Sequence, residues 1–168
     1  LTTSNMTGAI DSAFIDRADI KQYIGNPGVG ARYEILRTCV QELGRVGLVS
    51  HVESLLDPTT LRNMLPTPPP TFQQLRVLQD DGSSASRVAR HSMLLHAVAQ
   101  TCEGFSGRAL RKLPFLAHAL FGGGGGSDGP TEASLPFEGY LVALHRAVEH
   151  EKAARAAMPS ASDAPSTA

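Results

Sequence analysis

The chain has 168 residues, a net charge of −1 and 42% apolar residues, enough to build a core in one or two small domains. The near-zero charge gives no electrostatic basis for binding nucleic acid or an anionic membrane surface. No run of about 18 apolar residues is present that would span a membrane. The two cysteines, Cys39 and Cys102, form no CxxC pair, so neither a disulfide framework nor a cysteine zinc site is expected.

The first 27 residues carry the pattern of an α/β fold. Residues 1–5 are typical of a buried strand that runs out into a polar tip, and residues 10–15 of a short apolar helical turn. Residues 19–25 alternate between apolar and polar side chains and predict a second strand. Two strands without partners do not form a stable sheet. Because the first residue is not Met, we expect the chain to be a piece of a longer protein.

The next segment begins with a clear helix and then loses its periodicity. Residues 29–46 place apolar side chains, from Ile35 to Val46, on one stripe at helical spacing and predict a helix, with Gly44 and Gly47 at its frayed end. The proline-rich run 65–70 is incompatible with a helix or a central strand. Residues 48–91 are therefore predicted to form a surface insertion with one short helix near 72–79.

The remainder of the chain is predicted to be helical. Three further helices are expected, over residues 92–102, 107–120 and 136–157. The inner face of the first would include Met93, Leu94, Ala97, Val98 and Cys102, and that of the second would include Leu120. Either Ser106 or Gly107 is expected to cap the second of them. The glycine-rich residues 122–130 predict a flexible linker, and residues 158–168 a disordered tail. The expected fold class is an α/β remnant followed by a mainly α domain.

The common phosphate-binding and metal-binding motifs are absent from the sequence. No G-x-x-x-x-G-K-[ST] occurs, and the glycines of 25–32 and 122–126 lack the Lys and Ser/Thr that reach phosphate and magnesium. No apolar strand ends in Asp-Glu. The six histidines form no HExxH motif, so no metal site is expected, and His118 is predicted to be a core or boundary residue. The chain by itself is not expected to hydrolyse a nucleoside triphosphate.

Three polar residues are candidates for a functional role. Arg17 follows an apolar helical turn, where a solvated cation would complement the helix dipole. Arg108 lies in the first turn of a predicted helix, the positive end of the dipole, and the simplest interpretation is that it points to water. Asn5, at the tip of a strand, is a common turn residue. Spacing alone favours a surface role for all three and leaves a functional role open.

Longer runs of sequence resemble one protein family. Residues 1–5 and 10–25 resemble the second region of homology of an AAA+ ATPase. The run ADIKQYIG of residues 18–25 is similar to the pachytene checkpoint protein 2 family, also called the thyroid receptor-interacting protein 13 family. So is EGFSGRALRKLPFLAHAL of residues 103–120. The resemblance covers residues 1–47 and 92–120, whereas 48–91 and the glycine linker do not match well.

The resemblance implies a domain layout and roles for the three candidates. Residues 1–27 would end the large α/β subdomain of an AAA+ protein, and residues 28–157 would form its helical lid. Asn5 resembles the sensor 1 residue, between the attacking water and the γ-phosphate. Arg17 resembles the arginine finger, which acts on ATP bound by the neighbouring subunit. Arg108 resembles sensor 2, which contacts the γ-phosphate of its own subunit.

The resemblance also implies an activity for the parent protein. It would be an ATPase that uses ATP and Mg²⁺, with most ligands of both outside this chain. It would assemble as a homo-hexamer and remodel HORMA-domain proteins, often through an adaptor, in meiotic chromosome axis control and checkpoint signalling. The implied location is nuclear or chromosomal and cytoplasmic, without direct nucleic-acid or membrane binding.

Two alternatives remain open at this point. The chain could be a non-catalytic helical interaction module, or a truncated subunit that docks into rings. It could also derive from another AAA+ protein such as a severing enzyme, although the wording of residues 18–25 and 106–120 argues against that.

Overall fold

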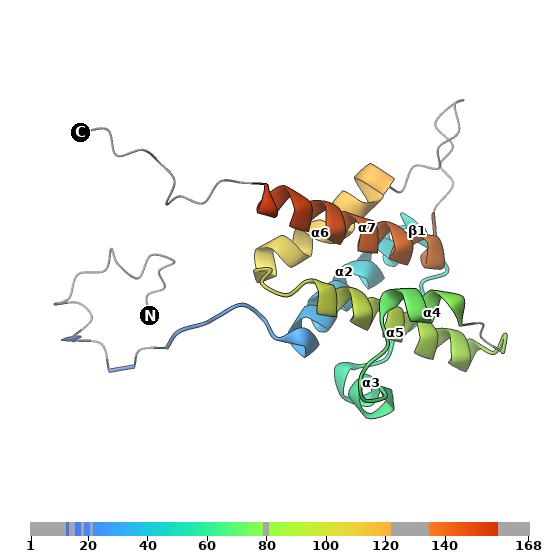
Figure 1. Cartoon of the computed structure of the whole chain (residues 1–168), viewed down its shortest axis with the longest axis horizontal. Coiled ribbons are helices and arrows are strands. Elements are labelled where there is room, and N and C mark those ends of the chain that lie inside the picture. Colours follow the sequence, from blue (N-terminus) through green and yellow to red (C-terminus); the bar gives the residue numbers. More distant parts are fainter. Residues whose placement is uncertain are drawn as a thin grey trace.

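The computed structural model describes residues 13, 16–17, 19–20, 22–78, 81–121 and 135–157. Its helices are α2 (Val29–Arg45), α3 (Pro58–Met64), α4 (Phe72–Val77), α5 (Ser84–Thr101), α6 (Gly107–Phe121) and α7 (Phe137–Ala156). Strands β1 (Val49–Ser50) and β2 (Leu135–Pro136) form a parallel pair. The four long helices make a bundle, and α3 lies on the opposite side of it from α6 and α7 (Figure 1). The described part of the chain is therefore mainly helical, as predicted.

Helix α2 is the central element of the bundle and packs against both α5 and α6. Its bounds agree with the prediction to within one residue. Four of its apolar side chains are fully buried: Tyr33, Leu36, Val40 and Leu43. Val46, which was predicted on the same stripe, is 51% exposed because it lies at the C-cap.

The C-terminal end of α2 is an ordered, hydrogen-bonded cap. The prediction that Gly44 and Gly47 mark a frayed end was therefore wrong. Gly47, with φ of +81°, adopts the left-handed conformation that glycine tolerates best. The Leu48 N–H donates to the Leu43 carbonyl at 3.0 Å and the Gly47 N–H to the Gly44 carbonyl at 3.1 Å, the two bonds of a Schellman motif. A Cβ at Gly44 would lie 2.7 Å from Cγ2 of Val52. Glycine therefore lets the segment after β1 cross α2 closely.

Residues 48–91 form part of the core, so the prediction of a surface insertion was wrong. This segment buries five apolar side chains: Val49, Leu55, Leu61, Phe72 and Leu75. Its helices α3 and α4 have seven and six residues, too few for a periodic stripe to show in the sequence. The short helix expected near 72–79 is confirmed as α4. Each of the two is set by a side-chain cap, from Asp57 and from Thr71.

Helix α5 begins eight residues earlier than expected, at Ser84 rather than residue 92. The Ser83 hydroxyl accepts from the Ser86 N–H at 3.1 Å, a side-chain N-cap. The first two turns are largely polar and only partly buried, so the sequence shows no apolar periodicity that would predict them. The inner face that was predicted further along is confirmed for Leu94, Ala97, Val98 and Cys102.

Helices α6 and α7 run along each other and agree with the predictions to within one residue. The Tyr140 hydroxyl, fully buried between them, donates to the Pro114 carbonyl at 2.9 Å. Leu120 was predicted to face inward but is 51% exposed, because the inward position of this last turn is taken by Phe121, which packs against the core with its ring centroid 6.5 Å from that of His150 on α7.

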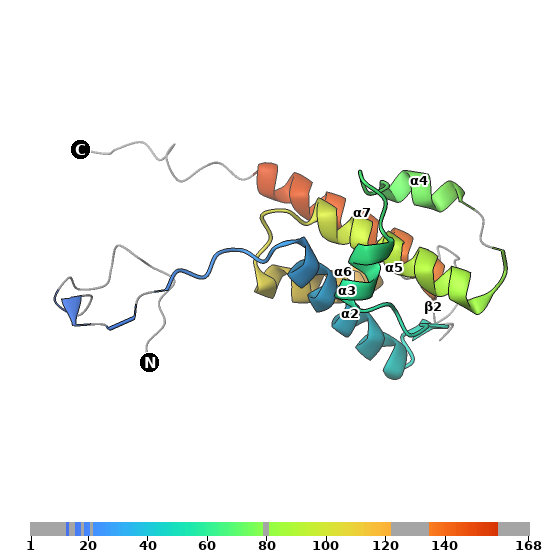
Figure 2. The ribbon, with the colours of Figure 1, turned by 90° about the horizontal axis from the view of Figure 1, so that it is seen from below.

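The strand predicted for residues 19–25 is not formed by those of its residues that the structure describes. Ile20, Tyr23 and Ile24 are 84–86% exposed, and this part of the chain runs away from the bundle in two perpendicular views (Figures 1 and 2). A strand needs a neighbour to pair with, and the bundle offers none there. The predictions for residues 1–5, the linker 122–130 and the tail 158–168 lie outside the described residues, and the domain boundaries remain predictions.

Candidate functional site

The N-terminus of α6 concentrates positive charge. The Ser106 hydroxyl accepts from the Ala109 N–H at 3.3 Å, which identifies Ser106 as the cap. Arg108, the second residue of α6, is exposed, and Arg111 and Lys112 follow one turn later. The first turn contains no acidic side chain. Three cations therefore gather at the end of the helix that is already positive.

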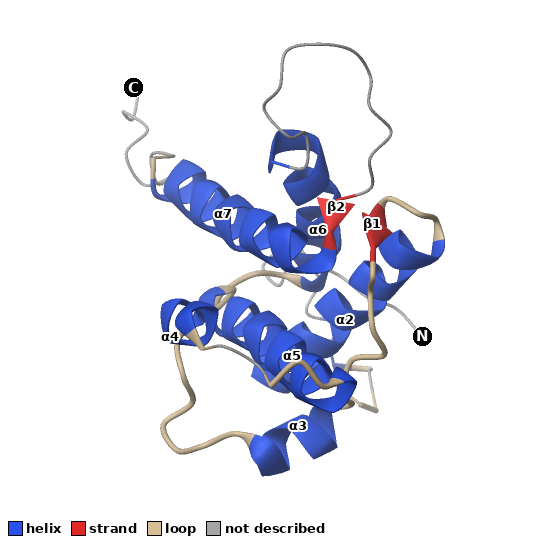
Figure 3. Cartoon of the chain, turned by 90° about the vertical axis from the view of Figure 1, so that its right-hand side faces the viewer, coloured by secondary structure: helices blue, strands red, loops and turns tan. Residues whose placement is uncertain are grey.

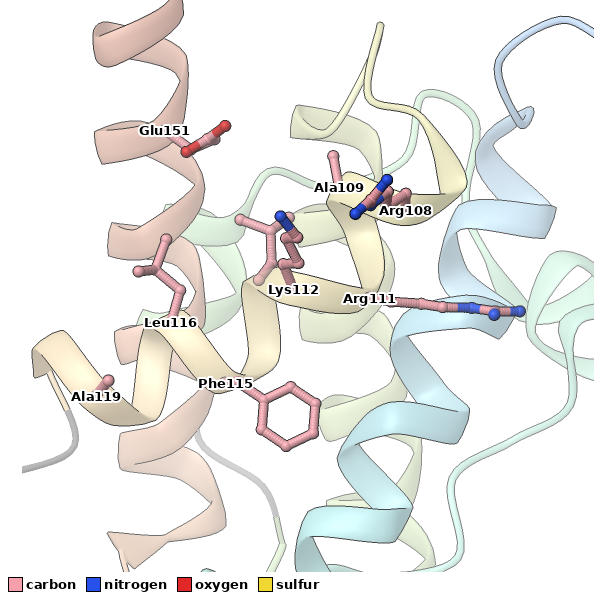
Figure 4. Close-up of a pocket in the computed structure, with 9 residues that line it drawn as sticks. Arg108, Ala109, Arg111, Lys112, Phe115, Leu116, Ala119 and Glu151 are labelled. Atoms are coloured by element: carbon pink, nitrogen blue, oxygen red, sulfur yellow. The ribbon is translucent and has the colours of Figure 1, made fainter. Parts of the chain in front are cut away.

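A surface depression of about 840 Å³ lies along this part of α6. Figure 4 shows it with the Arg111 side chain extending toward α2 and Glu151 contributed by α7. Burial raises the pKa of the Cys39 thiol on α2, and the nearby Arg111 charge opposes that rise, which is consistent with this orientation. The depression is lined by Arg108, Ala109, Arg111, Lys112, Leu113, Phe115, Leu116, Ala119 and Glu151.

The loop that presents Arg108 is anchored to the end of α7. Phe105, three residues before Arg108, is 2% exposed. The guanidinium carbon of Arg155 lies 4.0 Å from the centroid of the Phe105 ring. Nε of Arg155 also lies 3.0 Å from Oε1 of Glu151, so Glu151 both lines the depression and orients Arg155. A cation–π contact of this kind stabilises by about 0.5–1 kcal/mol at a partly exposed site.

The same loop is tied on its other side to the start of α2. Nδ2 of Asn26 donates to the Gly104 carbonyl at 3.2 Å. The buried Arg32 donates from Nε to the Ala99 carbonyl at 2.8 Å and from Nη1 to the Pro27 carbonyl at 3.2 Å. Ala99 lies in the last turn of α5, where carbonyls lack helical partners and cations are favoured. Arg32 therefore joins α5 to the segment that enters α2.

These anchoring residues were missed by the sequence analysis. The one available signal was Arg32 itself, a cation four residues before Leu36 and so on the core-facing side of α2. Nothing in the sequence indicated Asn26 or Arg155, since their partners lie 78 and 50 positions away in the chain.

Two of the three predicted site residues, Arg108 and Arg17, are among the residues that the structure describes. Arg108 lies in the first turn of a helix and is exposed, as expected. Arg17 is an exposed turn residue. Asn5 lies outside the described residues.

A second charged cluster joins the segment after β1 to α5 and α7. The Glu53 carboxylate lies 2.9 Å from Nε of Arg87 and 3.2 Å from Nδ1 of the buried His91. Arg90 pairs with Glu138 at the start of α7 at 2.5 Å (Figure 3 shows these elements together). Burial lowers the pKa of His91. These contacts hold elements together, and they lie away from the depression on α6.

Within the described ranges, no group of three or more His, Cys, Asp or Glu side chains could hold a metal ion. None of the helices in the part of the chain that the structure describes combines the length and the apolar character needed to cross a membrane.

Comparison with known proteins shows the family of the chain. Residues 28–152 match the family model of the TRIP13-like, AAA+ ATPase lid C-terminal domain. The chain belongs to this family. The match includes residues 48–91, so the expectation that this segment falls outside the resemblance was wrong. The resemblance to the pachytene checkpoint protein 2 family is confirmed, and the family is one of AAA+ ATPases, which generally use nucleotide and Mg²⁺.

Relatives and a solved structure agree with the TRIP13-like assignment. The chain is 51% identical to a pachytene checkpoint protein 2 homolog of Oryza sativa subsp. indica over 124 residues, which cover 71% of this chain and 24% of that protein. It is 40% identical to the Homo sapiens homolog over 151 residues, covering 90% of this chain and 29% of the relative. The structure of C. elegans PCH-2 matches with a TM-score of 0.59 and 25% identity, covering 89% of this chain and 32% of that one. The chain thus spans about a quarter to a third of these proteins.

Proposed function

We propose that this chain is the nucleotide-sensing lid of an AAA+ ATPase, in which Arg108 contacts the γ-phosphate of ATP bound by its own subunit. The supporting observation is the charge at the start of α6. Arg108, Arg111 and Lys112 occupy the positive end of a helix whose first turn contains no acidic residue. The helix dipole repels cations at this end, so the arrangement is unfavourable in isolation. A bound anion would make the local electrostatic interactions favourable.

The residues present fit a phosphate group. A guanidinium supplies a fixed fork of donors with a permanent charge, and helix N-termini bind phosphates through their amides and dipole. Bound ATP would supply the scissile phosphoanhydride, with Mg²⁺ neutralising charge on its phosphate oxygens. The described residues offer no ligand cluster for that metal, so its protein ligands would come from the rest of the parent protein.

The packing around Arg108 suggests how nucleotide state would move the lid. The loop before Arg108 is anchored to α7 through Arg155 and to the start of α2 through Asn26. A pull on Arg108 would therefore act on α2 and α7 together and not on α6 alone. We propose that loss of the γ-phosphate releases the whole bundle as one body.

The remaining roles rest on the resemblance and the family. We assign Arg17 as the arginine finger that acts on the ATP of the neighbouring subunit, and Asn5 as the sensor 1 residue that orients the attacking water. The parent protein would be a homo-hexamer that remodels HORMA-domain proteins in meiosis and checkpoint signalling, in the nucleus and on chromosomes and in the cytoplasm. An exposed Arg17 is consistent with action across a subunit interface.

Arg108→Ala in the full-length parent protein tests the central assignment. We expect ATP turnover to be lost while the protein still assembles, because only the γ-phosphate contact is removed. Arg45→Ala is the matched control. Arg45 is the last residue of α2, its side chain is 72% exposed, and it pairs with the neighbouring Glu42. Turnover equal to wild type in the Arg108 variant would remove the sensor assignment.

The role of Arg17 is tested by mixing variants. Subunits with Arg17→Ala lack the finger but keep their own phosphate loop, whereas phosphate-loop variants keep the finger. Mixed rings should regain part of the activity if Arg17 acts on the neighbouring site. Absence of recovery at every mixing ratio would contradict action in trans.

A second candidate function is a non-catalytic docking module. Phe115 and Leu120 on α6 are 56% and 51% exposed, which supports contact with another protein surface. Sedimentation of the chain with the full-length protein distinguishes the two, because a docking module should co-migrate with the ring. Separate migration would reject the docking function.

A further inference from the structure

The loop between α3 and α4 has no role in the proposed nucleotide site. Residues 65–71 adopt neither helix nor strand, and Pro66, Thr67, Pro68 and Pro69 are exposed. Thr67 is the only Ser or Thr in the 168 residues that is followed by Pro. The loop thus presents a single Thr-Pro step to solvent.

The two ends of this loop are fixed to the core. Leu61 in α3 and Phe72 in α4 are 1% and 4% exposed. The neighbouring hydroxyls are engaged in helix caps, since Thr60 donates to Asp57 at 2.5 Å and Thr71 to Gln74 at 3.0 Å. Prolines prevent the intervening residues from continuing either helix. Thr67 therefore lies in an exposed loop whose two ends are held by the core.

We propose that Thr67 is the phosphoacceptor of a proline-directed protein kinase. Pro68 has no N–H, so a kinase pocket that lacks an acceptor at the next position takes proline without leaving a buried donor unsatisfied. The Thr67 Oγ1 attacks the γ-phosphorus of ATP, the new O–P bond forms, and the bond to the β,γ-bridging oxygen breaks to release ADP. The hydroxyl proton passes to a carboxylate base of the kinase.

The phosphate would mark a different face from the proposed nucleotide site. Helix α3 packs on α2 and α5, and α4 packs on α5, whereas α6 packs on α2 and α7. Figures 1 and 3 place the α3–α4 loop on the opposite side of the bundle from α6. A phosphate adds a charge of about −1.5 to −2 to a chain of net charge −1. The phosphate would create a negatively charged docking site on the α3–α4 loop and would leave the surroundings of Arg108 unchanged.

The test is phosphorylation of the purified chain by a proline-directed kinase with labelled ATP, with the modified residue mapped by mass spectrometry. We expect one phosphate, on Thr67, and none in Thr67→Ala. Thr67→Ser restores an acceptor and should be phosphorylated. Pro68→Ala keeps the acceptor but should lower the initial rate by about tenfold or more, equivalent to about 1.4 kcal/mol of transition-state binding. Circular dichroism confirms that each variant is folded.

Three outcomes would overturn the proposal. They are no incorporation while a Thr-Pro control peptide is phosphorylated, incorporation at another residue, and an undiminished rate in Pro68→Ala. A basophilic kinase serves as the specificity control and should leave Thr67 unmodified. Because the assay does not involve Arg108, its failure would leave the proposed lid function untouched.

Discussion

The guanidinium of Arg155, near the end of α7, covers the ring of Phe105 in the α5–α6 loop, with 4.0 Å between the guanidinium carbon and the ring centroid. The ring itself is buried in the core. Arg155 thereby closes the loop that leads to Arg108 without contributing charge to the depression on α6. The contact gives the C-terminal end of α7 a role in positioning the candidate site.

This contact predicts two different losses of stability. Phe105→Ala should lower the free energy of unfolding by about 3–5 kcal/mol, the usual cost of removing a buried aromatic ring. Arg155→Ala should lower it by only about 0.5–1 kcal/mol, the contribution of an exposed cation–π contact. Urea unfolding of the two single variants and the double variant measures both values and their coupling. A coupling of zero would show that the stacking contributes nothing.

Arg32 is predicted to be a structural arginine of the lid. Arg32→Met keeps the aliphatic stem but leaves the Ala99 and Pro27 carbonyls without their donor. We expect a loss of about 1.5–3 kcal/mol, typical of hydrogen bonds to a charged group. Arg45→Met is the matched control on the same helix, because Arg45 pairs with Glu42 where both side chains are exposed, and such pairs contribute about 0–1 kcal/mol. Equal losses would contradict the structural role of Arg32.

Gly44 is predicted to stabilise the fold although it lies inside a helix, where glycine is normally unfavourable. Gly→Ala in a helix normally stabilises by about 0.5–1 kcal/mol, but here the new methyl would meet Val52 at 2.7 Å. We expect Gly44→Ala to destabilise by about 1–3 kcal/mol, the usual cost of overpacking. Thermal and urea unfolding measure the change.

Two further variants separate the clash from helix propensity. Gly30→Ala lies in the same helix, and its Cβ would meet only the Arg62 guanidinium at an ordinary 3.7 Å, so it should be neutral or stabilising. Gly44→Ala should cost less in a Val52→Ala background, because the two sites are in contact. An unchanged cost in that background would show that the clash is not the cause.

Three histidines predict a loss of stability in mild acid. Burial lowers the pKa of His91, His96 and His145 below 6.5. The unfolded chain therefore binds protons at a higher pH than the folded one, and the free energy of unfolding must fall as the pH drops below about 6.5. The Glu53 carboxylate that faces His91 opposes this trend without reversing it.

Urea unfolding at several pH values between 5 and 8 measures this slope. His145→Phe retains a ring for the stack on Phe72, whose centroid lies 4.2 Å away, and removes one titrating group. Its stability should depend less steeply on pH than that of the wild-type chain. A wild-type stability that stays constant or rises toward pH 5 would contradict the prediction.

The sequence predicted the long helices because their information is local. The apolar stripes of α2, α6 and α7 recur every three or four residues, and Ser106 identifies the start of α6 and hence the place of Arg108. It did not predict α3, the first turns of α5 or the burial of Leu55 and Leu61, because short capped helices bury only one or two side chains each and show no period.

Residue identity and local spacing thus determined, from the sequence by itself, the helical class and the exposed Arg108 at a helix start, and the resemblance of longer runs indicated the family. Only the tertiary structure decided what holds that arginine in place. Arg155 meets Phe105, Asn26 meets Gly104 and Arg32 meets Ala99 across 50, 78 and 67 positions of chain. Contacts of that kind depend on how the helices pack, and packing is a property of the whole core that no local pattern contains.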